Sequence, residues 1–351
     1  MSIHFSAVAG ISESGEGEPA DGWAANGMSL PRMMHIFNRR NSSARGRLIA
    51  LALFVCMLAA PLCAPAEEAA LTLPEPWPEV IDRVNTPDAY PDFAFAQGET
   101  LLEAVNPSLQ DCDALLLRCG GETMLVDCAT YAQSPRVVEM LRAMNVERLD
   151  YVLISHPHHD HTEGFELIAS TFEVGALMLC FPQDENAHMK KLLLVAAEKG
   201  IDVSYFHSGD GMTLGEARIS FWQLEDASAS VNSRSAQLKA TLGHRSILLT
   251  GDIEPDGARA MLSSAELGWM SADILKYPHH GVSSMPEGYL DAVRPGFIFM
   301  TAVVKERYGK RAVAASGIPW CYTNKDLLYM STNGSTWLVE RRPVSVDELQ
   351  R

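Results

Sequence analysis

The chain has 351 residues, of which 47% are apolar and 21% are charged, as in an ordinary globular protein. Its formal net charge is −16. This charge argues against tight binding to nucleic acid or to an anionic membrane surface, because both repel an acidic protein. We therefore expect a small-molecule or phosphodiester substrate and no stable nucleic-acid complex.

The first 66 residues predict an N-terminal extension followed by a signal peptide or membrane anchor. Four arginines between positions 39 and 47 precede an unbroken apolar run from Leu48 to Ala60, and Ala64-Pro65-Ala66 follows as a small-residue cleavage site. A run of this length suits a signal peptide, whereas a membrane span needs about 20 residues. We expect an extracytoplasmic protein, secreted or anchored at the outer face of the cell membrane, that meets a membrane only through this segment.

The rest of the chain divides into a linker and one domain. Residues 67–100 are rich in proline and acidic residues and predict a linker. Residues 101–345 predict a hydrolase domain in which strands and helices alternate. Within it, segment 114–129 holds two apolar runs around Gly120-Gly121, which is typical of a hairpin. A helix should begin near Ser134-Pro135, because proline suits the first turn of a helix.

The later elements of the domain follow the same alternation. Strands are expected at residues 149–155, 176–181, 201–206, 212–222, 235–252, 272–281 and 296–302. Helices are expected near residues 184–199 and after Glu254, and a C-terminal hairpin should turn at Asn333-Gly334. This order predicts an α/β fold of two sheets packed face to face with helices outside.

A cluster of histidines follows the first buried strand, in the sequence VLISHPHHDHTEGF. In an extended segment His156 and His158 point the same way and can share one cation. Asp160 and His161 are adjacent, so they can serve a second cation only if the chain turns there. His159 alternates to the other side and is left out of the site. A surface loop that binds metal adventitiously is the alternative.

Two later strand ends offer further ligands. The strand in SILLTGD leads to Asp252, and the strand in DILKYPHHG leads to His279 and His280. We favour His280 as the ligand and keep His279 as an outer hydrogen-bond donor or an alternative ligand. Imidazole and carboxylate groups without thiolate suit zinc and tolerate manganese, so we expect two divalent metal ions, zinc first.

The segments LISHPHHDHTEG, SILLTGD and ILKYPHHGVSS together resemble the metallo-β-lactamase superfamily, and most of all the hydrolase domain of ComEC-type DNA-uptake proteins and their free-standing exported relatives. The resemblance implies a four-layer αββα sandwich with the site at the sheet edge. It also implies that His156 and His158 bind one metal, that Asp160 and His161 bind the other, and that Asp252 bridges them. Asp160 would orient a metal-bound hydroxide that attacks a phosphoryl or carbonyl centre.

The sequence departs from this pattern in two places. Many members of the superfamily have another histidine ligand before the bridging aspartate, but His188, His207 and His244 stand in unsuitable settings. The ComEC-like group places polar residues there, which Asn232 would match. The ComEC-like segment YGHP is also replaced here by YGKR, so Lys310 and Arg311 are expected either to clamp a substrate phosphate or to lie on a solvated helix face.

These observations predict an exported metal-dependent hydrolase that cleaves a phosphodiester in a nucleotide or nucleic-acid type of substrate. Two alternatives remain open. One is hydrolysis of a lactam, lactone or thioester by the same metal site. The other is a non-catalytic binding protein on the same fold.

Overall fold

The computed structural model describes residues 80–82, 94–264, 267–303, 307–324 and 326–343. The expected leader, residues 1–66, lies outside these ranges, and so does most of the expected linker. Within the described ranges, no helix has both the length and the apolar character needed to cross a membrane.

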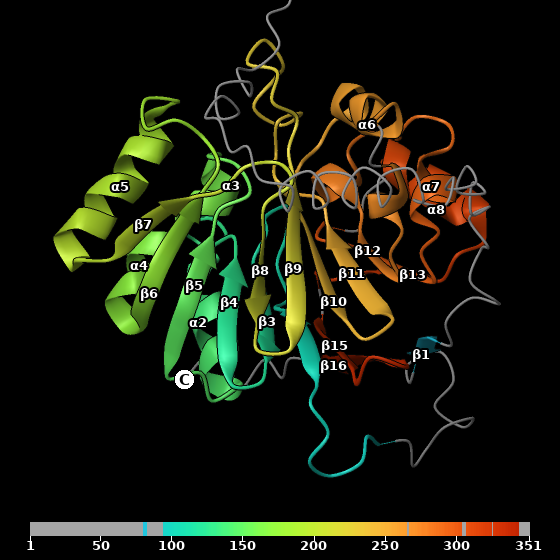
Figure 1. The fold of residues 1–351 in the computed structure, drawn as a ribbon, viewed down its shortest axis with the longest axis horizontal. Coiled ribbons are helices and arrows are strands. Elements are labelled where there is room, and N and C mark those ends of the chain that lie inside the picture. The colour runs from blue at the N-terminus through green and yellow to red at the C-terminus, as the bar shows by residue number, and fades with distance from the viewer. Residues whose placement is uncertain (1–79, 83–93, 265–266, 304–306, 325, 344–351) are drawn as a thin grey trace, which may run out of the picture. The chain divides into compact units, whose positions relative to one another are not determined.

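The first sheet has nine strands in the order β1-β16-β15-β2-β3-β4-β5-β6-β7 (Figure 1). The strands are β1 (Val80–Asp82), β2 (Leu102–Asn106), β3 (Leu115–Cys119), β4 (Glu122–Val126), β5 (Arg148–Leu153), β6 (Glu173–Leu179), β7 (Asp202–Tyr205), β15 (Asp326–Thr332) and β16 (Trp337–Pro343). Strands β4 to β7 are parallel to one another, whereas β2, β3 and β4 pair antiparallel. The expected hairpin at Gly120-Gly121 joins β3 to β4, and both glycines have positive φ.

The second sheet has seven strands in the order β14-β13-β12-β11-β10-β9-β8. The strands are β8 (Gly211–Leu214), β9 (Ala217–Trp222), β10 (Gln237–Leu242), β11 (Arg245–Leu249), β12 (Ile274–Lys276), β13 (Phe297–Met300) and β14 (Trp320–Tyr322). Strands β11 to β14 run parallel, so their carboxyl ends lie at one edge of the sheet.

Helices cover the outer faces of both sheets (Figure 1). The helices of the first half are α2 (Ser134–Ala143), α3 (His159–Thr162), α4 (Phe165–Thr171) and α5 (Ala187–Lys199). Those of the second half are α6 (Pro255–Leu262), η1 (Leu267–Met270), η2 (Pro278–Gly281), α7 (Tyr289–Val293) and α8 (Tyr308–Ser316). The side chain of Asn186 caps α5 by accepting a hydrogen bond from Met189 N, and Gly200 ends the helix in a left-handed conformation.

Three hydrophobic cores separate these layers. Along β3, Leu115 and Leu117 face the core between the sheets, whereas Leu116 faces the core under α2, α4 and α5. Along β13, Phe299 faces the central core and Ile298 faces the core shared with α6, α7 and α8. Helix, sheet, sheet and helix therefore form the four-layer αββα sandwich that the sequence predicted.

The fold brings several strand ends to one place. Strands β4 and β5 of the first sheet lead directly to Asp127 and to the histidine cluster. Strands β11 and β12 of the second sheet lead to Asp252 and to His280. Ligands in α/β folds gather at the carboxyl ends of strands, and here these ends carry the candidate ligands.

Candidate metal centre

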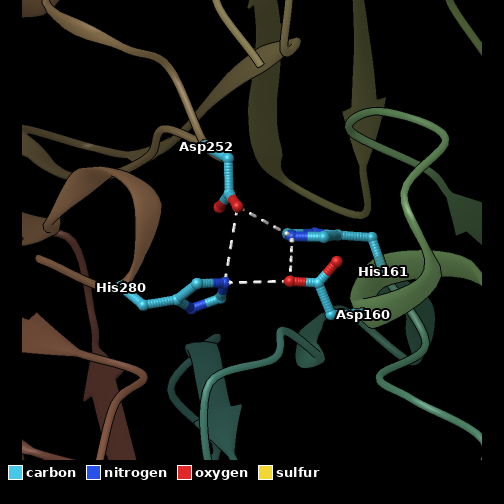
Figure 2. A group of neighbouring side chains, drawn as sticks. All are labelled: Asp160, His161, Asp252 and His280. Atoms are coloured by element: carbon cyan, nitrogen blue, oxygen red, sulfur yellow. Dashed lines mark hydrogen bonds and ion pairs between the residues drawn. The ribbon is translucent and has the colours of Figure 1, made fainter. Parts of the chain in front are cut away.

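Four side chains from the short helices and turns at the strand ends of both sheets lie close together (Figure 2). Asp160, His161, Asp252 and His280 each offer one ligand atom, and the four atoms lie within 4.8 Å of one another. Asp252 Oδ2 lies 3.3 Å from His161 Nε2 and 3.4 Å from His280 Nε2. Asp160 Oδ2 lies 3.3 Å from His280 Nε2. The arrangement brings together two carboxylates and two imidazoles around one point.

His156 and His158 lie beside this group. His156 is fully buried, and its Nε2 lies 3.1 Å from His158 Nδ1 and 4.0 Å from Asp252 Oδ2. His158 is extended and half-buried, and the one-turn helix α3 begins at the next residue. The chain therefore turns between His158 and Asp160. This turn was the requirement for Asp160 and His161 to serve a second cation.

Of the other histidines of the domain, His159 lies beside Asp160 but is exposed, and only His279 also approaches Asp252. The imidazole of His159 is 63% exposed and that of His207 is 74% exposed. His188 lies on α5, and His244 lies in the turn between β10 and β11. The Nε2 atom of His279 lies 3.7 Å from Asp252 Oδ2.

Asn232 contacts the outer part of the site. Its Nδ2 donates a hydrogen bond of 3.3 Å to Glu254 Oε1. The same Glu254 oxygen lies 3.8 Å from His279 Nδ1. Asn232 is thus linked to the cluster indirectly. It hydrogen-bonds Glu254, and Glu254 lies beside His279.

Sequence reasoning missed a buried layer of charged residues behind the ligands. Asp127 accepts hydrogen bonds from Ser155 N and Oγ, at 2.8 Å and 2.7 Å, and its Oδ2 lies 2.8 Å from His161 Nδ1. Lys276 Nζ lies 2.5 Å from Asp113 Oδ2 and 3.9 Å from Asp252 Oδ1. This layer fixes the His161 ring and places one permanent positive charge under the site.

Two of these residues carried a signal in the sequence. Asp127 follows an apolar strand, as Asp252 does, and Lys276 is the last residue of an otherwise apolar strand. A charged residue inside such a strand is seldom buried without a partner. Asp113 lies in an irregular loop and carried no comparable signal.

The carboxylates dominate the electrostatics of the site. Burial alone would raise the pKa of Asp252, but the neighbouring His280 and His161 hold this pKa well below its usual range. Burial would lower the pKa of His161, whereas the charges of Asp252 and Asp127 raise it well above its usual value. Burial and the charge of His161 lower the pKa of His156. The site therefore attracts positive charge, which protons supply in the absence of a metal ion.

The side chains present fit divalent cations. His161 Nε2 and Asp252 Oδ1 are buried without a hydrogen-bond partner, which costs about 1–3 kcal/mol for each group. A cation would give both atoms a partner. Within the described ranges, the groups of neighbouring candidate ligands contain only histidine and aspartate. This donor set suits zinc and tolerates manganese.

The metal-free protein should lose stability as the pH rises through about 9. Burial lowers the pKa of His280, but Asp252 and Asp113 raise it from 6.5 to about 9. Protonation of His280 then stabilises the fold fully below pH 6.5, by an amount on the order of 3 kcal/mol. That contribution disappears as the pH rises through 9, which denaturant unfolding in chelator should show.

The matched control for this pH dependence is His280→Asn, which suits the positive φ of this position and should flatten the decline. A metal-free wild-type stability that stays constant or rises between pH 7 and 9.5 would contradict the assignment.

A known protein family matches the part of the chain that holds these residues. Residues 108–285, just over half of the chain, match the family described as the metallo-beta-lactamase superfamily. The match contains the histidine cluster, Asp252 and His280. Among solved structures, the metallo-beta-lactamase fold protein YhfI from Bacillus subtilis aligns with a TM-score of 0.43 and 14% identity, over 63% of this chain and 95% of that one.

Two curated relatives each align with about half of this chain. ComE operon protein 3 of Bacillus subtilis (strain 168) is 26% identical over 179 residues, which cover 49% of this chain and 22% of that protein. Competence protein ComA of Neisseria gonorrhoeae is 23% identical over 186 residues, which cover 52% of this chain and 24% of that protein. The chain spans less than a quarter of either relative, and the predicted ComEC-type relatedness is confirmed. The chain therefore belongs to the metallo-beta-lactamase superfamily of metal-dependent hydrolases.

Proposed function

We propose that the protein is an exported phosphodiesterase that uses two divalent cations, with zinc as the favoured metal, and acts on a nucleotide or nucleic-acid type of substrate. The observation that carries the proposal is the position of Asp252 Oδ2 between two sets of ligands. His161 and His280 approach it within 3.4 Å, and His156 lies 4.0 Å away with His158 beside it. A carboxylate in this position can bridge two cations.

A pair of bound cations would supply Lewis acidity and lower the pKa of a water molecule. The residues of the chain would do the rest. Asp252, 2% exposed, is placed to hold both cations, whereas Asp160 is 16% exposed and borders the accessible side. Burial raises the pKa of Asp160, but the hydrogen bond from His280 and the charge of His161 lower it below its usual range. Asp160 therefore stays ionised and can orient a water by accepting its proton in a hydrogen bond.

A small phosphodiester agrees best with the charge of the chain. A net charge of −16 opposes retention of a long polyanion. Relatedness to competence proteins favours a phosphodiester over a lactam or thioester, and an exported enzyme would meet such molecules outside the cell. The proposed location rests on the signal peptide or anchor that the first 66 residues predict.

Helix α8 is the element proposed to bind the substrate phosphate. Its first turn packs against the turn that carries His280, since Gly309 has room for no side chain beside Tyr277 and Gly281. Lys310 and Arg311 lie in this first turn. Lys310 and Arg311, which replace the last two residues of the ComEC-like segment YGHP, are the cations proposed for the clamp.

Replacing Lys310 and Arg311 together with alanine should raise KM for a phosphodiester about tenfold, which corresponds to about 1.4 kcal/mol of lost binding. The value of kcat should change little, because the metal ligands remain in place. Steady-state kinetics of the metal-loaded protein measure both constants. The control replaces Lys190 and Lys191 on α5 and keeps the same net charge change. Equal KM values for the two double variants would reject the clamp.

A substrate panel tests the proposed reaction. The metal-loaded full chain should cleave bis(4-nitrophenyl) phosphate and a dinucleotide faster than a lactam, a lactone or a thioester. Preferential cleavage of one of the carbonyl substrates would replace the proposal with that hydrolase activity. A chain that binds metal but turns over none of them would be a binding protein.

A further inference from the structure

We infer that His279 is the third imidazole ligand of the first cation, together with His156 and His158, and that Glu254 holds it in place. The inference rests on the proposed two-cation site and assigns to His279 a role that no histidine between the first motif and Asp252 can fill. His188 lies on α5, His207 is exposed and His244 lies in the turn between β10 and β11, and none of them belongs to a group of neighbouring candidate ligands.

Four histidines point the same ring atom at one oxygen. The Nε2 atoms of His161, His280, His279 and His156 lie 3.3, 3.4, 3.7 and 4.0 Å from Asp252 Oδ2. Two of them, His161 and His280, form the compact group with Asp160. His156 and His279 remain, and each has its Nε2 at the same carboxylate. His279 is therefore the remaining imidazole that approaches the oxygen proposed to bridge the two cations.

A carboxylate oxygen lies behind the His279 ring. Metal-binding histidines usually direct the second ring nitrogen at a carboxylate, carbonyl or hydroxyl group, which fixes the ring. His161 Nδ1 faces Asp127 Oδ2 at 2.8 Å, and His280 Nδ1 faces Thr301 Oγ1 at 2.9 Å. His279 Nδ1 faces Glu254 Oε1 at 3.8 Å.

The contact between His279 and Glu254 is longer than a hydrogen bond, and His279 Nδ1 is buried without a hydrogen-bond partner. Its carboxylate partner is nevertheless held in place. Glu254 accepts hydrogen bonds from Ser230 Oγ at 2.8 Å and from Asn232 Nδ2 at 3.3 Å. A small rotation of the His279 imidazole toward a bound cation can therefore shorten this contact to a hydrogen bond. The Glu254 carboxylate that would accept it is already held in place. In this arrangement Asn232 positions Glu254 through its Nδ2 atom.

The backbone explains how neighbouring histidines reach the same carboxylate. His279 and His280 both have left-handed conformations, with φ of 47° and 50°, which residues with a Cβ seldom adopt. Such strain costs on the order of 1–3 kcal/mol per residue and is typical of functional sites. The turn is tied to the end of β11, since His279 N donates a hydrogen bond of 3.2 Å to Gly251 O. This conformation places both rings around Asp252.

The test counts the cations bound to the full chain and measures their affinities. The variant is His279→Asn, because asparagine tolerates positive φ and its side chain is too short to replace the imidazole. The wild type should bind two zinc ions, and the variant should bind the first one more than about 100-fold more weakly, beyond the loss caused by an outer hydrogen-bond partner. His207→Asn is the matched control and should bind both ions as the wild type does.

Cobalt substitution gives a readout that is independent of activity. The visible absorption of the first cobalt ion should change in His279→Asn and stay unchanged in His207→Asn. Glu254→Gln should weaken the first cation about 10- to 100-fold while keeping the cobalt spectrum, since the ligands remain. If His279→Asn does not fold, the affinity of Glu254→Gln for the first cation tests the proposed pairing of His279 with Glu254 instead.

Unchanged affinity and an unchanged cobalt spectrum in His279→Asn would overturn the role of His279 and leave the proposed function intact. Wild-type affinity in Glu254→Gln would overturn the role of Glu254. A wild-type chain that binds no cation would overturn the proposed function itself, and this inference with it.

Discussion

Replacement of Asp252 with asparagine is expected to lower kcat/KM for a phosphodiester by roughly 10⁴-fold, as for a residue that acts within a catalytic unit. Asparagine keeps the shape of the side chain but removes its negative charge. Four imidazoles approach Asp252 Oδ2 within 4.0 Å, so both cation sites depend on this charge. The measurement is steady-state kinetics with saturating zinc, alongside the zinc content of each protein.

The control for Asp252→Asn is Asp202→Asn, which removes the same charge from the exposed strand β7. It should leave both kcat/KM and zinc content at the wild-type level. If Asp252→Asn retained more than about a tenth of the wild-type kcat/KM, the loss would be under 1.4 kcal/mol and the bridging role would be wrong.

Replacement of Lys276 with methionine is expected to destabilise the metal-free protein by about 3–5 kcal/mol, the usual cost of removing one partner from a buried ion pair. Lys276 is fully buried, and its Nζ lies 2.5 Å from Asp113 Oδ2. It also donates a hydrogen bond of 3.0 Å to Gly251 O. Methionine fills a similar volume but removes the ammonium group, which is the positive charge closest to the buried Asp113 carboxylate. Urea unfolding in the presence of chelator measures the free energy.

Two further variants separate charge from packing. Lys239→Met removes a half-buried ammonium that donates to the carbonyl oxygens of Trp269 and Ser271, and it should cost only about 1–2 kcal/mol. Adding Asp113→Asn to Lys276→Met should restore at least half of the lost stability, since the uncompensated charge is then gone. Equal destabilisation by Lys276→Met and Lys239→Met, without recovery in the double variant, would contradict the ion-pair account.

The parts of the site that the sequence predicts are those with local signals. His156, His158, Asp160 and His161 lie within six positions after a buried strand, so spacing alone indicates a shared task. Asp252 and His280 each follow an apolar strand, and parallel strands end at one sheet edge. The hairpins at Gly120-Gly121 and Asn333-Gly334 were predictable for the same reason, because turn residues act on their neighbours.

The rest of the site depends on contacts between distant parts of the chain. Asp113 binds Thr301, which is 188 positions away, and no periodic pattern links the two. The position of His279 depends on two consecutive positive φ angles, and two adjacent histidines in a sequence do not predict such angles. Likewise, β15 pairs with β2 although the whole domain lies between them. Only the folded topology brings these residues together.

The number of divalent cations bound per chain tests the central claim most directly. The full-length protein should be stripped with chelator, equilibrated with zinc, freed of excess metal and analysed for its elemental content. The account predicts two zinc ions per chain, because two sets of ligands share Asp252. A zinc content below one ion per chain, from protein that is folded by circular dichroism, would contradict it.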